Sequence, residues 1–202
     1  MNVFILSPGR TATKTLTYIF SKVPGYTSGH ETRCKYLGGE RVDYPENHIE
    51  CDNRLSWFMP RLTKKYSKEA VLVVVHRDHE SVAKSYNHRW QKINIMKAYS
   101  QGVLKREFSE NDLDVCRDYV SNVYEQIESF SGEWRHVVHL DLDDPELGVS
   151  EVLRLIGCPE KTESTLHDFS ITNLNPNKVS NFKRQRDVFR YNLKCIMHDM
   201  KW

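Results

Sequence analysis

The sequence predicts an α/β protein in which helices cover both faces of a parallel sheet. Two short apolar runs, Val3–Leu6 and Val71–Val75, have the length and composition of buried parallel strands. Each run is followed by apolar residues at helical spacing, and this alternation of strand and helix is typical of α/β domains. We therefore expect a three-layer α/β/α fold with a central parallel sheet.

The other elements continue this alternation along the chain. Apolar side chains three and four residues apart predict helices over residues 16–23, 55–66, from about 81, 113–130, 149–156 and 189–200. Further short apolar runs predict strands over 48–51 and 136–140. The segments Gln91–Glu110 and Ser170–Asn181 show weak periodicity, and we expect them to be surface loops.

The length and the charge of the chain predict one globular domain that binds a single anionic ligand. The chain has 202 residues and a net charge of +2, so we expect one domain over residues 1–202 and no nucleic-acid partner. Residues 178–202 form a basic C-terminal segment, with seven Lys or Arg against two Asp. Such a local basic end suits one anionic ligand, and a solvated helix face is the alternative explanation.

Cysteine usage and apolar patterning predict a cytoplasmic protein. The five cysteines include no C-x-x-C pair, so we expect neither a disulfide framework nor a metal site. The first residues lack the cationic start and long apolar stretch of a signal peptide. No run approaches the ~20 apolar residues of a membrane span, so none is expected.

The loop after the first strand has the residue types that bind a phosphate-like anion. It reads Ser-Pro-Gly-Arg-Thr-Ala-Thr-Lys-Thr-Leu over Ser7–Leu16. Backbone N–H groups at a helix start favour an anion, and the loop adds cations and hydroxyls from Arg10, Thr11, Thr13, Lys14 and Thr15. Only Lys14-Thr15 fit the Walker A motif. A polar turn capped by Thr is the alternative.

A second anion-binding segment follows the strand Val71–Val75. Arg77 comes two residues after the end of this strand, where α/β proteins bind ligands. Ser85 follows eight residues later and is expected about one turn into a helix, facing back toward Arg77. A guanidinium and a hydroxyl together bind a phosphate well. The alternative is Arg77 paired with a surface carboxylate.

The two segments together resemble the sulfotransferases that use 3′-phosphoadenosine 5′-phosphosulfate (PAPS). In that family a Lys/Arg-Ser/Thr-Gly-Thr-Thr loop holds the 5′-phosphosulfate, and this chain has Arg10–Lys14 there, with Ala12 in place of Gly and Lys14 in place of Thr. The family's Arg-x7-Ser motif, which holds the 3′-phosphate, corresponds to Arg77 and Ser85. The resemblance implies a P-loop NTPase-like sulfotransferase fold and PAPS as the bound donor.

The resemblance also implies a general base after the second strand. The run Tyr26–Arg33 occupies that place, and its Glu-Thr-Arg sequence looks like the tyrosylprotein and glycan branches, in which Glu is the base. Glu31 is therefore the expected base and His30 the second choice, with Arg33 as a partner either of the Glu31 carboxylate or of an acidic acceptor. Lys14 is expected either to neutralise the transferred sulfonate or to take over part of the role of the family's usual Lys.

One family element is missing from the sequence. The Gly-rich segment near the C-terminus, which helps to hold the 3′-phosphate, has no counterpart here. The basic stretch that contains Lys178 and Lys183 is expected to replace it.

The predicted activity is transfer of a sulfonate group from PAPS to a hydroxyl or amine of a small-molecule or glycan acceptor. Asp52, Asn53 and Arg54 are expected to line the acceptor pocket, although helix capping explains Asp52 or Asn53 equally well. The acceptor itself stays open. One alternative is a P-loop kinase or NTPase that uses Lys14-Thr15 with magnesium, although Val71–Val75 is not followed by the Asp such enzymes need. The other alternative is a non-catalytic nucleotide-binding module.

Overall fold

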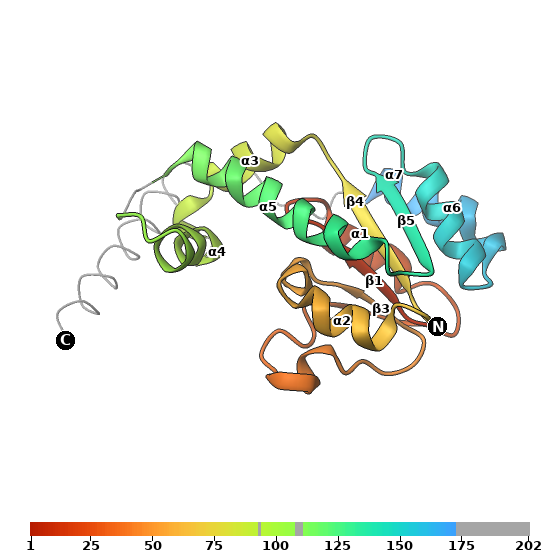
Figure 1. The fold of residues 1–202 in the computed structure, drawn as a ribbon. Helices are drawn as coiled ribbons and strands as arrows, with labels where there is room; N and C mark the ends of the chain where they lie inside the picture. The colour runs from red at the N-terminus through yellow and green to blue at the C-terminus, as the bar shows by residue number, and fades with distance from the viewer. Residues whose placement is uncertain (93, 108–110, 173–202) are drawn as a thin grey trace.

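The computed structural model describes residues 1–92, 94–107 and 111–172. Within these residues, five parallel strands form one sheet in the order β2-β3-β1-β4-β5 (Figure 1). The strands are β1 Val3–Leu6, β2 Thr27–His30, β3 His48–Cys51, β4 Val71–His76 and β5 His136–Asp141. The central parallel sheet that the apolar runs predicted is confirmed.

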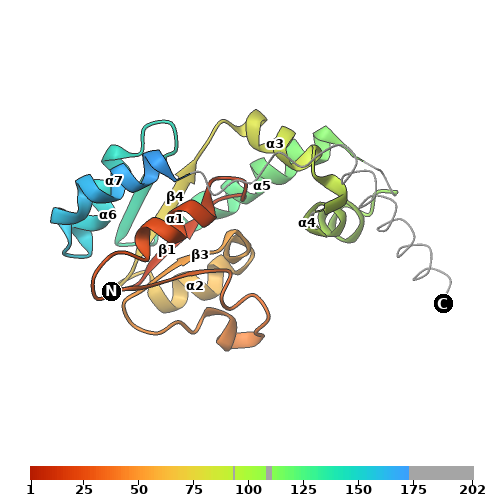
Figure 2. The same cartoon turned by 180° about the vertical axis from the view of Figure 1, so that it is seen from behind.

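Helices cover both faces of the sheet, as Figures 1 and 2 show from opposite sides. One face packs against α2 (Met59–Tyr66), α3 (His79–Asn87) and α5 (Leu113–Ser131), and the other against α1 (Thr13–Phe20), α6 (Glu146–Leu155) and α7 (Thr162–Ile171). Alternate residues of β1 supply the two cores: Phe4 and Leu6 belong to the first, and Val3 and Ile5 to the second. The fold is the expected three-layer α/β/α arrangement.

The strand order creates a crevice at the carboxyl ends of the strands. After β1 the chain forms β2 and β3 on one side of it, and then crosses to form β4 on the other side. In parallel sheets, ligands bind outside the carboxyl ends of the strands at such a switch point. Because the strands are parallel, the loops that follow β1, β2, β3 and β4 all leave the sheet at these carboxyl ends.

The segment predicted as a loop over Gln91–Glu110 is helical in part, which corrects that prediction. It contains α4 (Asn94–Lys97), which continues directly into a π-helical turn over Ala98–Val103. Met96 and Tyr99 are buried in the first core. This packing stabilises a segment too short and irregular to show a helical repeat in the sequence.

Three smaller differences concern the helices, two of them at a helix start and one an unexpected helix. The helix expected over 55–66 begins as a 3₁₀ helix, Asn53–Phe58, and becomes α-helical only at Met59. Helix α3 begins at His79, two residues before the expected start, because the Asp78 side chain caps it by accepting a hydrogen bond from Ser81 N. Helix α7 has no counterpart among the expected elements, and its last residues replace the start of the loop expected over 170–181.

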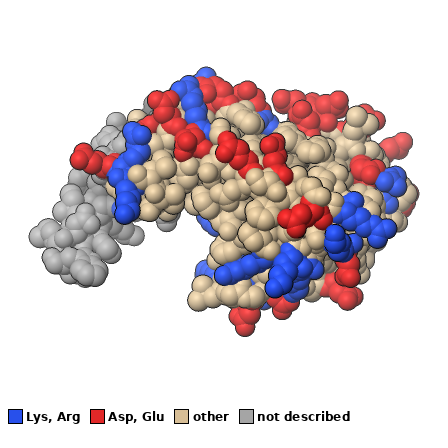
Figure 3. Space-filling view, in the orientation of Figure 1, with Lys and Arg blue, Asp and Glu red and all other residues tan. Residues whose placement is uncertain are grey.

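The basic segment 178–202, including Lys178 and Lys183, and the helix expected over 189–200 lie outside the described residues. Basic and acidic side chains are interspersed on the face that Figure 3 shows, in keeping with the near-neutral net charge. Among the described residues, no helix is both long and apolar enough to cross a bilayer.

Candidate active site

A cleft of about 200 Å³ lies where β1, β2 and β3 end. It brings together residues that are far apart in the sequence: Gly9, Arg10, Ala12, Thr13, Lys14, Thr15, His30, Glu31, Asn53, Arg54, Tyr86 and Ile95. Both the predicted anion-binding loop and the predicted general base therefore face one cavity. Asn53 and Arg54, expected near the acceptor, line it as well. Asp52 does not line it and instead caps the 3₁₀ helix that follows β3 by accepting a hydrogen bond from Arg54 N.

The loop after β1 is held in place through the carbonyl oxygen of Pro8. The Tyr86 hydroxyl of α3 donates to this oxygen at 2.6 Å, and the Tyr119 hydroxyl of α5 donates at 3.2 Å. The next residue, Gly9, has a φ of 90°, and a Cβ there would lie 2.5 Å from the Tyr86 oxygen. Only glycine fits this position, so the loop is tied to two helices at its tightest point.

Helix α1 begins with an uncapped N-terminus beside the cleft. Ala12 precedes the helix in the left-handed region, with a φ of 53°, and no side chain caps the first turn. The free N–H groups at such a helix start attract an anion. Thr13, Lys14 and Thr15 of the first turn line the cleft.

Thr11 differs from the other hydroxyl residues of the loop. Its side chain is fully buried, and its Oγ1 lies 2.6 Å from Ser7 Oγ. The Thr11 hydroxyl therefore stabilises the loop from behind, and the side chain is not part of the cleft lining.

Arg10 joins the two predicted anion-binding segments. Its Nε donates to Ser85 Oγ at 3.1 Å, and its carbonyl oxygen accepts a hydrogen bond of 2.6 Å from the Arg77 guanidinium. The sequence predicted that Ser85 would face Arg77, whereas in the structure both residues contact Arg10 instead. The segments after β1 and β4 thus form one connected unit.

Three guanidinium groups gather at this unit. Burial lowers the pKa of Arg10, and the charges of Arg89 and Arg77 lower it further, against the raising effect of Tyr86. In the described part of the chain, no carboxylate forms an ion pair with these three arginines. An unbalanced, half-buried positive charge of this kind favours a bound anion. Sequence reasoning missed Arg89, because it follows α3 without any motif.

Glu31 follows β2 in a strained conformation. Its φ is 56°, in the left-handed region that a glutamate rarely adopts. Its carboxylate pairs with the guanidinium of Arg54. Burial lowers the pKa of Arg54, but the charge and hydrogen bond of Glu31 outweigh that effect and leave it raised. Arg33, the expected partner, instead lies over the ring of Tyr36, 4.8 Å from its centroid.

A buried hydrogen-bond network fixes the backbone at Glu31. The carboxylate of Glu50, which is fully buried in β3, accepts from Thr32 N at 2.7 Å and from Thr32 Oγ1 at 2.6 Å. His48 Nε2 lies 2.8 Å from the same carboxylate, and its Nδ1 lies 2.8 Å from Thr27 Oγ1. Backbone strain that the surroundings enforce in this way is common at functional sites.

His30, the second candidate base, also lies in the cleft. Its Nε2 is 3.2 Å from Thr13 Oγ1 at the start of α1. Among the residues that the structure describes, no group of three or more His, Cys, Asp or Glu is arranged to hold a metal ion.

Comparison with known proteins gives a likeness of fold. No family model and no curated protein matches the sequence. The sulfotransferase domain from the curacin biosynthetic pathway matches the structure with a TM-score of 0.50 and 13% identity, over 86% of this chain and 75% of that one. The mouse sulfotransferase SULT7A1 complexed with PAP matches with a TM-score of 0.43 and 9% identity, over 94% of this chain and 64% of that one. The chain therefore has the α/β fold of the sulfotransferases.

Proposed function

We propose that this protein transfers a sulfonate group from PAPS to a hydroxyl or amine, with Glu31 as the general base. The observation that carries the proposal is the unit formed by Arg10, Ser85 and Arg77. It joins the two segments that resemble the family's phosphate-binding motifs, and it borders the cleft that contains Glu31.

The cations, hydroxyls and backbone N–H groups around the cleft suit a nucleotide with an anionic group at each end. Lys14, Thr13, Thr15 and the uncapped start of α1 would hold the 5′-phosphosulfate, because all of them face the cleft. Arg77 and Ser85, with Arg89 beside them, would hold the 3′-phosphate. Arg10 contacts both residues of the second group and lines the cleft, so it lies between the two sites. Ala12 at the helix start adds a backbone position with positive φ, as the family's glycine would.

The protein's own contribution to the reaction is positioning, charge and one proton transfer. PAPS supplies the sulfonate group, which passes to the acceptor oxygen or nitrogen while PAP is released. The side chain of Glu31 forms an ion pair with Arg54 and accepts the proton of the acceptor. Lys14, in the first turn of α1, stabilises the negative charge that develops on the transferred group.

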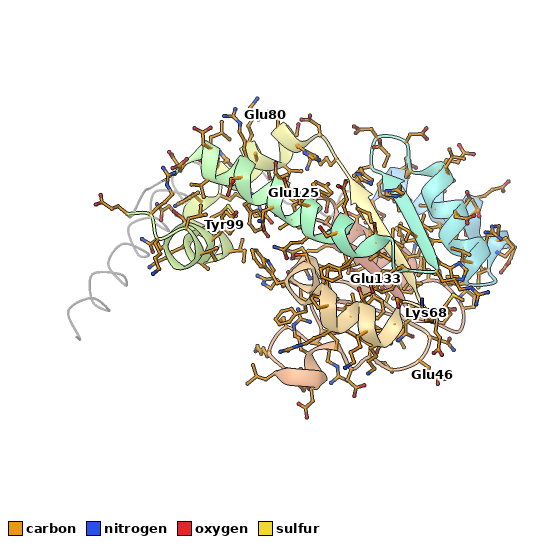
Figure 4. The ribbon with its side chains drawn as sticks, viewed as in Figure 1. Glu46, Lys68, Glu80, Tyr99, Glu125 and Glu133 are labelled. Atoms are coloured by element: carbon orange, nitrogen blue, oxygen red, sulfur yellow. The ribbon has the colours of Figure 1, made fainter. Side chains whose placement is uncertain are left out.

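Replacing Glu31 with Gln tests this role. General-base catalysis contributes roughly 10²–10⁴ in rate, so we expect the Glu31→Gln variant to lose sulfonate transfer by about this factor. Its affinity for PAP, measured by calorimetry, should stay at the wild-type value, because the Glu31 carboxylate pairs with Arg54 and not with a residue proposed to hold the phosphates. Glu46→Gln is the matched control, since Glu46, labelled in Figure 4, is exposed and precedes β3, whereas the cleft lies beyond the other end of that strand.

Other outcomes would overturn the proposal. Equal transfer rates in the wild type and the Glu31→Gln variant would remove Glu31 as the base. Hydrolysis of ATP that depends on magnesium, without any affinity for PAP, would identify the chain as a P-loop NTPase. PAP binding without transfer to any hydroxyl or amine would identify a non-catalytic module.

A further inference from the structure

A pair of histidines joins β4 to β5, outside the cleft. His76 Nε2 lies 2.8 Å from His139 Nδ1, and the two rings are stacked with their centroids 5.0 Å apart. A hydrogen bond between two ring nitrogens needs one nitrogen that carries a proton and one that does not. The pair can therefore accommodate one added proton, whereas a second added proton breaks the hydrogen bond.

The pair is connected to Arg77, which is proposed above to hold the 3′-phosphate. Arg77 directly follows His76 in the chain. On α5, the ring of Tyr124 is parallel to that of His76 at a centroid distance of 5.8 Å, and its hydroxyl donates to Val75 O at 2.9 Å. Burial raises the pKa of Tyr124 to about 12, and a hydrogen bond from the Arg77 backbone opposes this rise. Tyr124 thus contacts the backbone on both sides of His76.

Charged and titratable groups from three other elements face His76. They are His139 and Asp141 of β5, Glu128 of α5 and His79 of α3. Burial and the charge of His139 lower the pKa of His76, the carboxylates of Asp141 and Glu128 oppose this effect, and His79 adds to it. The net result is a lowered pKa, so the folded protein favours the neutral His76 that the hydrogen bond can use.

A fall in pH adds the protons that this arrangement disfavours. A histidine in an unfolded chain takes up a proton near pH 6.5, and His76 does so at a lower pH in the folded protein. When both imidazoles carry a proton, two like charges face each other where a hydrogen bond had been. The His76 ring then leaves its position against His139 and Tyr124, and the backbone that carries Arg77 loses a fixed neighbour.

We propose that the His76–His139 pair is a pH switch that acts on donor binding. At neutral pH the intact pair fixes the end of β4, so that Arg77 reaches both the Arg10 carbonyl and the 3′-phosphate. In acid the pair separates, Arg77 is no longer held in place, and the donor binds more weakly. This proposal rests on the sulfotransferase function above and adds a regulation of its donor site.

A His139→Asn variant tests the switch. The asparagine amide keeps a hydrogen-bonding group close to the position of Nδ1 but takes up no proton. His139 is exposed and does not line the cleft, so the substitution leaves the donor site itself unaltered. The matched control is His167→Asn, since His167 is exposed on α7.

The measurement is the affinity for PAP by calorimetry between about pH 7.5 and about pH 5, a range that spans the titration of histidine. The phosphates of PAP also take up protons in this range, but they do so equally for every variant. Comparison of the variants therefore isolates the effect of the imidazoles.

We expect the wild type and both variants to bind PAP equally at pH 7.5. At pH 5 the wild type and His167→Asn should lose about fivefold or more in affinity beyond the loss seen in His139→Asn, which is the lower end of typical coupling between two sites.

The stability of the protein without PAP gives a second readout of the pair. Because the pKa of His76 is lowered on folding, this group stabilises the protein above pH 6.5, and the contribution is lost as the pH falls through the folded-state pKa. The free energy of unfolding should therefore fall more steeply with acid in the wild type than in His139→Asn.

The contrary outcomes separate the switch from the function on which it rests. If PAP binds at pH 7.5 and its affinity falls equally with acid in the wild type and in His139→Asn, the switch is wrong and the donor site stands. If acid makes the wild type bind PAP more tightly than His139→Asn does, the imidazolium charges attract the donor, and the proposed direction is wrong. If the wild type binds no PAP at any pH, the proposed function is wrong, whatever the unfolding measurements show.

Discussion

The side chain of Arg10 donates a hydrogen bond of 3.1 Å to Ser85 Oγ, although 75 positions separate the two residues in the sequence. The loop after β1 and helix α3 are joined by this contact. Arg77 strengthens the connection through its 2.6 Å hydrogen bond to the Arg10 carbonyl. A ligand that binds one segment therefore meets the other in a fixed position, which lowers the entropic cost of binding an anion at both ends.

The contact between Gly9 and Tyr86 makes a prediction for stability. A Gly9→Ala variant would place a Cβ 2.5 Å from the Tyr86 oxygen at a φ of 90°. Backbone strain and the displaced hydrogen bond to Pro8 together should lower the free energy of unfolding by about 2 kcal/mol or more. Chemical denaturation measures this change.

A second glycine provides the matched control for Gly9. Gly132, which ends α5, has a φ of −61°, and a Cβ added there would meet no atom within 4 Å. Gly132→Ala should raise the free energy of unfolding by about 0.4–1 kcal/mol, because alanine restricts the unfolded chain. Equal effects at Gly9 and Gly132 would show that the loop after β1 is not held as described.

At Ala12, a substitution by glycine is expected to stabilise the protein, the opposite of its usual effect in a helix. Its φ of 53° is unfavourable for alanine and free for glycine. Ala12→Gly should therefore stabilise the protein by about 1 kcal/mol, or raise Tm by about 2–4 °C for a chain of this size. Ala83→Gly, in the interior of α3, should instead destabilise it by about 1 kcal/mol or more. A drop in Tm for Ala12→Gly would contradict the left-handed conformation at this position.

A substitution of Glu50 is expected to lower the rate of sulfonate transfer without changing the affinity for PAP. Its carboxylate holds Thr32, the residue after Glu31, through two hydrogen bonds. Glu50→Gln should lower kcat by about tenfold or more by misplacing Glu31, while PAP affinity is retained. Thr32→Val removes one of these bonds.

A double-mutant cycle identifies this positioning role. If Glu50 acts through Thr32, the loss of kcat in the Glu50→Gln, Thr32→Val double variant should be clearly smaller than the sum of the single losses. Additive losses, or a fall in PAP affinity equal to the fall in kcat, would mean that Glu50 only supports the fold.

Much of the fold could be predicted from the sequence, because buried parallel strands are short apolar runs. β1 and β4 are of this type, and each was predicted to within one residue. β2 was not, since Thr27–His30 contains no apolar run and its position came only from the family resemblance. The helix from Asn94 was missed because its stability comes from the burial of Met96 and Tyr99, not from a repeat.

The site was predictable where residues belong to a motif and not where they come together only in space. The loop from Arg10 and the Glu31 position follow a strand in the expected order, and both line the cleft. The pairing of Glu31 with Arg54 joins two different strand ends, and the position of Arg89 near Arg10 depends on how α3 packs. Neither relationship has a fixed spacing in the sequence.

Calorimetry of PAP binding tests the central claim most directly. Hydrogen bonds to charged groups contribute about 1.5–3 kcal/mol each, and each arginine is expected to make more than one contact. Arg10→Ala and Arg77→Ala should therefore each abolish detectable binding or weaken it by about a hundredfold or more. Arg154→Ala, which removes an exposed arginine of α6 paired with Glu151, should bind PAP as the wild type does. Wild-type affinity for PAP in both Arg10→Ala and Arg77→Ala would contradict the account.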